Sequence, residues 1–243
     1  MIKKFFRSIV MRERANSDTY RAYLEKRGVQ IGERVRFYSP EHTMIDTSCP
    51  WLISIGNDVS ITYGVVILTH DYSWKVLKRL DNSGEILGAQ GAVRIGNNVF
   101  IGMNTVIMRG VTVGDNVVIG AGSVVTKHCE SNSVYAGNPA RKIMTIEQYR
   151  EKRRSSQFAD AKKLALEYRR RFGCDPSIEE FREYFPLFCT ADQASKIPEF
   201  RRQMETAANY ADCYACMDEN GPIFDSYESF LKECYKEVSP DNM

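Results

Sequence analysis

The sequence predicts a mainly β protein in which short strands stack as the coils of a solenoid, with helical segments at both ends. Two observations support this fold class. Large aliphatic residues recur at every sixth position over much of residues 29–144, and an α-helical spacing replaces that pattern after Ile143. A short fixed period over many units is typical of a repeat fold, in which each coil packs only against its neighbours.

Residues 1–28 are expected to form a helical cap. Between Met1 and Asn16, apolar side chains alternate with Lys and Arg, a pattern that fits a basic amphipathic helix. Such a helix can close the open end of the coil stack, or it can make a weak membrane-surface contact through residues 1–14. We favour the cap. Residues 18–26 predict a second short helix, which Gly28 ends.

The clearest repeat begins at Ile95. The residue that follows each aliphatic position is mostly glycine, and the fourth one along is mostly small or β-branched. Because an extended strand alternates faces, one aliphatic residue per flat side can point inward, and glycine or a small polar residue permits the corner. Steps of six give the aliphatic column Ile95, Ile101, Ile107, Val113, Ile119 and Val125.

The earlier coils keep the spacing less regularly, and Glu41 interrupts their column of small residues. Six does not divide the interval from Ile67 to Ile95, so residues 71–92 are predicted to be an inserted loop. Long loops in compact repeat proteins are usually functional. The earlier aliphatic column is expected to comprise Ile31, Phe37, Thr43, Cys49, Ile55, Ile61 and Ile67.

Residues 145–243 are predicted to form a helical domain. Thr145 and Gln148 make a capping box, a helical face then runs to Phe172, and Gly173 ends it. Further helices are expected to begin near residues 175–177, at Pro198 and after Asp225. The basic runs in this domain are read as solvated helix faces.

Composition excludes several classes of function. A formal charge of +2 on 243 residues gives no global field for nucleic acid. Seven cysteines without a secretory signal favour reduced thiols and a cytoplasmic location. Helical spacing explains the Cys213 and Cys216 pair, so no metal is expected. No apolar run reaches the roughly 18 residues that a membrane span needs.

His70 is the candidate catalytic base. It is one of three histidines, and it stands where the first block of repeats ends and the inserted loop begins. A residue there projects from a rigid wall into a cleft, and imidazole suits proton transfer near neutral pH. A carboxylate should orient the imidazole, and two candidates stay open: the sequence neighbour Asp71, or Glu85 in the loop.

The hexads, the Thr69-His70-Asp71 segment before a loop, and residues 120–127 and 136–141 resemble the hexapeptide-repeat acyltransferases. They are most similar to the sugar O-acetyltransferase branch, which includes maltose, galactoside and capsular-polysaccharide enzymes. The resemblance covers residues 29–144. It implies a left-handed parallel β-helix, a homotrimer, acetyl-CoA bound between subunits, and a histidine that deprotonates an acceptor hydroxyl. By position it assigns acetyl-CoA contacts to Met103, Ala121, Thr126, Lys127 and Arg141.

Three departures from this family affect the site. Met103 stands where the sugar enzymes have a small polar residue, Gly64 replaces their acceptor-binding asparagine, and Met144 replaces a second arginine, for which Lys142 could substitute. The acceptor pocket is therefore expected to be rebuilt from other residues of this chain. The substrate-binding candidates are Tyr63, Asp71, Tyr72, Trp74 and Glu85.

These observations predict an acetyl-CoA-dependent O-acetyltransferase that acts on a saccharide, expected to be a surface or capsular polysaccharide precursor, with His70 as general base. Two other acceptors fit the same scaffold: an amino sugar, which would be N-acetylated, and an antibiotic. A different class of function is a non-catalytic trimeric scaffold whose helical tail binds a partner.

Overall fold

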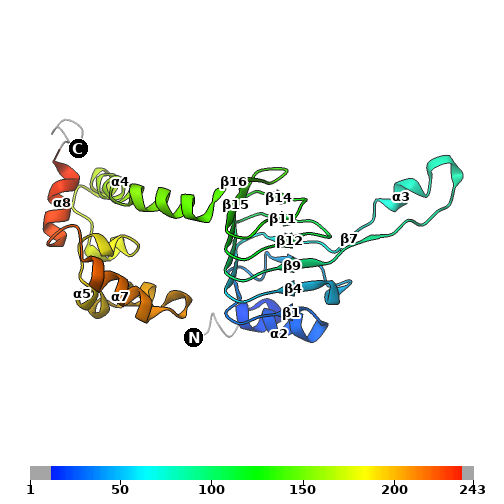
Figure 1. The fold of residues 1–243 in the computed structure, drawn as a ribbon, viewed down its shortest axis with the longest axis horizontal. Coiled ribbons are helices and arrows are strands. Elements are labelled where there is room, and N and C mark those ends of the chain that lie inside the picture. The colour runs from blue at the N-terminus through cyan, green and yellow to red at the C-terminus, as the bar shows by residue number, and fades with distance from the viewer. Residues whose placement is uncertain (1–11, 237–243) are drawn as a thin grey trace. The chain divides into compact units, whose positions relative to one another are not determined.

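The computed structural model describes residues 12–236. The chain divides into two compact units, residues 1–150 and 151–243. The first unit contains stacked parallel strands and the second contains helices (Figure 1). The predicted basic helix and its membrane contact, residues 1–14, lie almost entirely outside the described residues. Each described helix is too short or too polar to cross a membrane.

The repeats of the first unit form a parallel β-helix with three flat faces, A, B and C, and each hexad supplies one strand. Face A contains β1 (Gln30–Ile31), β4 (Ile53–Ile55), β9 (Val93–Ile95) and β12 (Thr112–Val113). Face B contains β2 (Arg36–Phe37), β5 (Val59–Ile61), β10 (Val99–Ile101), β13 (Val117–Ile119) and β15 (Ser133–Ala136), with antiparallel β16 (Arg141–Thr145) at its edge. Face C contains β3 (Met44–Ile45), β6 (Val66–Ile67), β11 (Val106–Ile107) and β14 (Val124–Val125).

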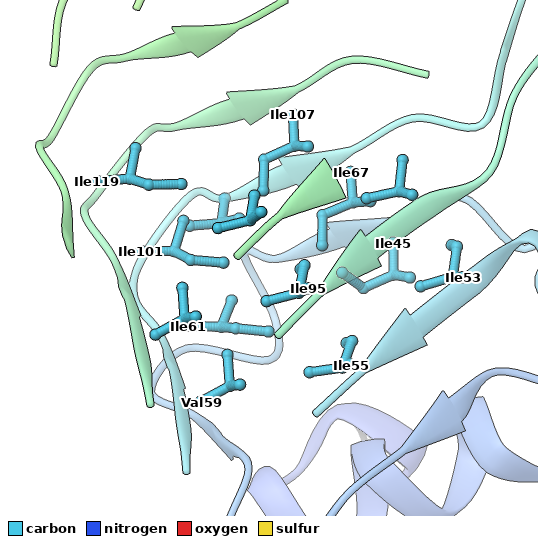
Figure 2. Close-up of a cluster of buried hydrophobic side chains, with 14 of the residues drawn as sticks. Ile45, Ile53, Ile55, Val59, Ile61, Ile67, Ile95, Ile101, Ile107 and Ile119 are labelled. Carbon is cyan, nitrogen blue, oxygen red and sulfur yellow. The ribbon is translucent and has the colours of Figure 1, made fainter. Parts of the chain in front are cut away.

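The predicted aliphatic columns form the core of this β-helix. Ile61, Ile101 and Ile119 are aligned in register on face B, and all three are buried (Figure 2). On face C, Ile67 pairs with Ile107 in the same way. The six-residue spacing therefore places one aliphatic side chain inward on each face of each coil.

The first coil departs from the predicted column. Ile45, and not Thr43, is the register partner of Ile67 on face C. The turn after Phe37 is longer than in the later coils, which moves the inward position along the chain. Thr43 is buried, but its hydroxyl donates to the carbonyl of Ser39 at 2.8 Å. Thr43 and Cys49 both lie outside the strands of the three faces, so their prediction as aliphatic-column positions was wrong.

Glycines at the corner between faces A and B permit close stacking of coils. A Cβ on Gly56 would lie 2.6 Å from the carbonyl oxygen of Gly96 in the next coil. The left-handed backbone at this corner is instead carried by polar residues such as Asn98 (φ 53°) and Asn116 (φ 55°). The Nδ2 of Asn98 donates to Oδ1 of Asn116 at 2.8 Å. Glycine is thus required at this corner for approach between coils, rather than for φ.

A helix packs on the first coil. After η1 (Arg12–Arg14), α2 (Ser17–Arg27) buries Tyr20 and Leu24 in the β-helix core. Gly28 ends α2 with a left-handed φ of 104°. The short helix predicted at residues 18–26 is confirmed, and it covers apolar side chains that an open end would leave in water.

The inserted loop is a hairpin. β7 (His70–Asp71) pairs antiparallel with β8 (Ala89–Gln90), and α3 (Trp74–Leu77) and η3 (Leu80–Asn82) lie between them. We call residues 72–88 the arm. In Figure 1 the arm extends away from the coils as two connecting segments that carry the short helix α3. The predicted interruption of the repeats therefore begins and ends at one pair of strands.

The second unit is helical and has an aromatic core that includes Phe181, Phe200 and Phe230. Its helices are α4 (Ile146–Phe172), which begins in the first unit, and then η4 (Ile178–Phe181), η5 (Phe185–Leu187), α5 (Ala191–Lys196), α6 (Pro198–Met204), η6 (Thr206–Ala208), α7 (Tyr210–Asn220) and α8 (Tyr227–Tyr235).

Several predicted helix boundaries in this region are confirmed. The Thr145 and Gln148 capping box precedes α4, Gly173 follows it with a φ of 69°, and Pro198 opens α6. The helix expected near residues 175–177 is replaced by two short 3-10 helices, η4 and η5. Helix α8 is capped by Ser226 instead of Asp225. Helix α5 was not predicted, and α7 was indicated only by the helical spacing of Cys213 and Cys216.

Candidate functional site

Two corners of the β-helix carry the predicted site residues. The C–A corner, where the chain turns from face C to face A, comprises residues 46–52, 68–92, 108–111 and 126–129. The B–C corner comprises residues 38–43, 62–65, 102–105 and 120–123. Because the strands stack in register, residues at one corner form a column along the axis of the helix.

His70 lies at the C–A corner, at the base of the hairpin, and pairs with a carboxylate from the coil before it. Its Nδ1 is 2.6 Å from Oδ2 of Asp46. The His70 side chain is 18% exposed and the Asp46 side chain only 4%. The imidazole can therefore reach a substrate, while the carboxylate behind it is shielded from water.

Asp46 is held as an anion by its neighbours. Burial opposes ionisation, but hydrogen bonds from Thr69 and Ser48 outweigh it and hold the pKa of Asp46 well below its usual range. The backbone N–H and hydroxyl of Thr69 donate to Oδ2 at 3.0 and 2.5 Å, and the N–H of Ser48 donates to Oδ1 at 2.9 Å. An ionised carboxylate accepts from the Nδ1–H of His70, which leaves the Nε2 lone pair available as a base.

Neither carboxylate expected to orient His70 is its partner. The carboxylate of Asp71 instead binds Arg109 and Ser73. The Nε of Arg109 donates to Oδ2 at 2.8 Å, and the hydroxyl and N–H of Ser73 donate to Oδ1. The Ser73 hydrogen bonds, with help from Arg109, lower the pKa of Asp71 to about 2. Glu85 is an exposed residue of the arm. The structure therefore assigns the orienting contact to Asp46.

The sequence did contain a signal for Asp46, but the first coil concealed it. Asp46 directly follows Ile45, the inward residue of β3, and Leu68 directly follows the partner Ile67 on the next coil. Strict six-residue spacing places Thr43 in that column instead. The longer turn after Phe37 thus hid a carboxylate one coil from the histidine.

The aromatic candidates near His70 differ in their surroundings. The rings of Tyr72 and His70 meet edge to face, with centroids 4.7 Å apart. The ammonium of Lys75 lies 5.1 Å from the centroid of the Tyr72 ring. Trp74 begins α3 in the arm and is half-buried. Tyr72 is therefore the predicted aromatic residue that the structure places against the imidazole.

Tyr63 lies at the B–C corner, away from the C–A corner that carries His70. Its ring packs against His42, with centroids 4.5 Å apart. Tyr63 shares its column with Met103, since its carbonyl accepts from the N–H of Asn104, the residue after Met103. Within one chain, the structure therefore separates Tyr63 from the other predicted acceptor residues.

The residues predicted to contact acetyl-CoA are divided between the two corners. Met103 and Ala121 lie at the B–C corner, and Arg141 begins β16 opposite Ala136, just past this corner. Thr126 and Lys127 lie at the C–A corner, on a later coil than His70. All five residues are exposed. Within the described residues, no acidic side chain pairs with Lys127 or Arg141.

Lys142 does not accompany Arg141. It is the register partner of the buried Tyr135, and its Nζ donates to Glu130 at 2.8 Å. Because neighbouring residues of a strand point to opposite faces, Lys142 and Arg141 diverge. The expectation that Lys142 could replace the missing arginine is therefore not supported.

One hollow of the β-helix lies away from the predicted site residues. A hollow of about 150 Å³ lies against face B and includes Ser60, Phe100 and Ile146 among its lining residues. None of the predicted site residues lines it. Among the described residues, no cluster of His, Cys, Asp or Glu is arranged to hold a metal ion.

The chain is similar in sequence to several known proteins. Residues 92–127 match the family described as bacterial transferase hexapeptide (six repeats). The chain is 44% identical to protein CapG of Staphylococcus aureus over 155 residues, which cover 62% of this chain and 83% of CapG. It is 35% identical to galactoside O-acetyltransferase of Escherichia coli over 96 residues, which cover 40% of this chain and 45% of that protein.

A solved structure of galactoside acetyltransferase in complex with coenzyme A superposes with a TM-score of 0.43 at 28% identity. The superposition covers 61% of this chain and 83% of that one.

Proposed function

Because the chain belongs to the hexapeptide-repeat transferase family, we propose that this acyltransferase moves an acetyl group from acetyl-CoA to a hydroxyl of a saccharide. The galactoside O-acetyltransferase relative supports a sugar as the acceptor. The resemblance to CapG supports a surface or capsular polysaccharide precursor, and the family supports left-handed winding of the coils. The observation that carries the proposal is the His70–Asp46 pair at the start of the inserted hairpin.

His70 is the general base of the proposed reaction. Its Nε2 takes the proton of the acceptor hydroxyl while that oxygen attacks the acetyl carbonyl of the thioester. The thiolate of CoA then leaves and takes the proton back from the imidazolium. Asp46 fixes the Nδ1–H tautomer and stabilises the positive charge that forms on the ring. No covalent acyl-enzyme is needed.

Acetyl-CoA would be held by residues from both corners. Lys127 and Arg141 suit the phosphates, the first as a point charge and the second as a planar fork. Both are exposed and have no acidic partner among the described residues. Ala121 and Met103 would contact the rest of the molecule, Ala121 through its backbone. Thr126 offers a hydroxyl beside Lys127.

A site divided between two corners supports a homotrimer. If the B–C corner of one subunit faces the C–A corner of the next, the two halves of the acetyl-CoA set and the separated Tyr63 meet at one interface. The outer side of face C offers a surface for such contacts, because Met44, Val66, Val106 and Val124 form an apolar column there. The matching column on face A is polar, with Gln30, Ser54, Arg94 and Thr112.

Release of the CoA thiol tests this function. Wild type and His70→Ala are incubated with acetyl-CoA and a panel of methyl glycosides that includes galactose, glucose and glucosamine derivatives. Acceptor-dependent thiol release by wild type, lost in His70→Ala, is the expected result. Mass spectrometry of the product separates O-acetyl from N-acetyl transfer. Binding of acetyl-CoA without turnover on any acceptor would favour a non-catalytic scaffold.

A further inference from the structure

Trp51 is an exposed tryptophan at the same corner as His70. It lies in η2 (Pro50–Leu52), within the turn that connects Asp46 to face A. Its relative exposure is 72%, the largest of any aromatic residue at this corner in the described chain, compared with 59% for Tyr72. An exposed indole beside a candidate site offers a ligand an apolar ring face and a hydrogen-bond donor.

Two contacts anchor the segment before Trp51 to the two strands of the hairpin. Asp46 accepts from His70 in β7, and the Sγ of Cys49 lies 3.7 Å from Nε2 of Gln90 in β8. Gln90 is itself the register partner of His70. The segment that contacts the base of the hairpin therefore continues directly into η2, which carries the indole.

Local packing holds η2 in place. Pro50 is buried, and its Cγ lies 3.7 Å from the position that a Cβ on Gly28 would occupy. The N–H of Leu52 donates to the carbonyl of Cys49 at 3.0 Å. Pro50 thus packs against the protein and Leu52 is half-buried, while no ring or cation within the described residues packs on the indole.

The other aromatic residues offered for the acceptor are less available. Lys75 lies over the ring of Tyr72, His42 packs on Tyr63 at the other corner, and Trp74 is half-buried. We propose that Trp51 is the stacking platform for the acceptor saccharide, a specificity-determining residue that orients one sugar face toward His70. The indole binds the C–H face of a pyranose ring, and its Nε1–H can donate to a hydroxyl. This inference rests on the proposed function.

Intrinsic fluorescence tests the contact directly, because the chain has two tryptophans. In the Trp74→Phe variant, the emission comes from Trp51 alone. Titration with methyl β-galactoside, methyl α-glucoside and the methyl glycoside of glucuronic acid should shift or quench that emission with at least one of them. The Trp51→Phe/Trp74→Phe variant is the background control. Absence of any response at saturating sugar would overturn the platform.

Kinetics with Trp51→Ala and Trp51→Phe complete the test. Trp51→Ala should raise the KM for the acceptor by about tenfold, while the KM for acetyl-CoA stays within about twofold. Trp51→Phe retains a ring and should stay within about threefold of wild type. An unchanged acceptor KM in an active Trp51→Ala enzyme refutes the platform but leaves the acetyltransferase intact.

Two further measurements separate the remaining outcomes. A lower mass for Trp51→Ala in light scattering would place the indole between copies of the chain and would overturn the proposal. If wild type transfers acetyl to no sugar, the proposed function fails, and the single-tryptophan titration still decides whether Trp51 contacts a saccharide.

Discussion

Nδ1 of His70 lies 2.6 Å from Oδ2 of Asp46, and the two residues come from adjacent coils of the β-helix. Strand β3 and strand β6 pair in register just before them, so the distance between the two side chains is set by the spacing of stacked strands. The pair therefore exists only when the two coils are stacked.

Replacing His70 with Ala should lower kcat by about 10²–10⁴-fold, because the acceptor hydroxyl loses its base. The coils should remain folded, since His70 lies at the hairpin and not in the aliphatic core. Steady-state kinetics and circular dichroism measure the two effects. A variant with the wild-type rate would remove His70 from the mechanism.

Replacing Asp46 with Asn should lower kcat by at least about tenfold, and by no more than the loss of the base itself. An amide no longer fixes the tautomer or stabilises the imidazolium. The KM for acetyl-CoA should change little, because Asp46 contacts the imidazole and not the cofactor residues. Asp71→Asn and Glu85→Gln are the matched controls, and neither should lower kcat as far. A larger loss of kcat in either control would reassign the orienting carboxylate.

Asp46 should also make stability depend on pH. The folded state holds the pKa of Asp46 below the ordinary carboxyl value of 3.8, so the carboxylate binds fewer protons when folded. Its stabilisation is fully present above pH 3.8 and is lost progressively as the pH falls below that value. Urea unfolding at pH 7, 4 and 3 should show a steeper loss of stability in wild type than in Asp46→Asn. Parallel curves would contradict the assignment.

Replacing Arg141 with Ala should raise the KM for acetyl-CoA more than it lowers kcat, because a phosphate contact binds ground and transition states alike. Loss of a charge-assisted hydrogen bond is worth about 1.5–3 kcal/mol, or roughly 10–100-fold in KM. Lys142→Ala is the control. Its side chain is already paired with Glu130, and it should change the KM little. An equal effect of both changes would indicate a general electrostatic field instead of a contact.

Substitution by Asp should have different effects at the neighbours Val106 and Ile107, because their side chains point to opposite sides of face C. Ile107 is fully buried, so Ile107→Asp leaves an unpaired charge in the core and should abolish folding. Val106→Asp should fold but fail to form trimers. Thr112→Asp, on the outer side of face A, should affect neither property. Light scattering and thermal unfolding distinguish the three variants, and a trimeric Val106→Asp would exclude face C as the interface.

The parts of the fold that follow a strict period could be predicted from the sequence. Ile101 and Ile107 obey the spacing and are buried, and the break between Ile67 and Ile95 located the hairpin. The first coil could not be predicted in the same way, because extra residues after Phe37 change the spacing, and Glu41 in the column of small residues was not enough to show by how much. That change is also why Asp46 was missed.

In the helical unit, too, only part of the structure could be predicted from the sequence. Helix α4 has a capping box and a glycine stop, and both ends were predicted. Helix α5 is only six residues long and is capped by Thr190 and Gln193, so it offers too short a pattern for periodicity to reveal. The recurring glycines were recognised in the sequence. The close approach between coils that requires them was not, because it depends on a segment from another coil.

The arm leaves and re-enters the coils through one short antiparallel strand pair, in which His70 pairs with Gln90 and Asp71 pairs with Ala89. Its length is thereby uncoupled from the register of the strands above and below. Insertions or deletions between residues 72 and 88 could remodel the entrance to the reaction centre while the imidazole and its carboxylate keep their places. Under the proposed function, arms exchanged between relatives are expected to change the choice of acceptor while the β-helix stays the same.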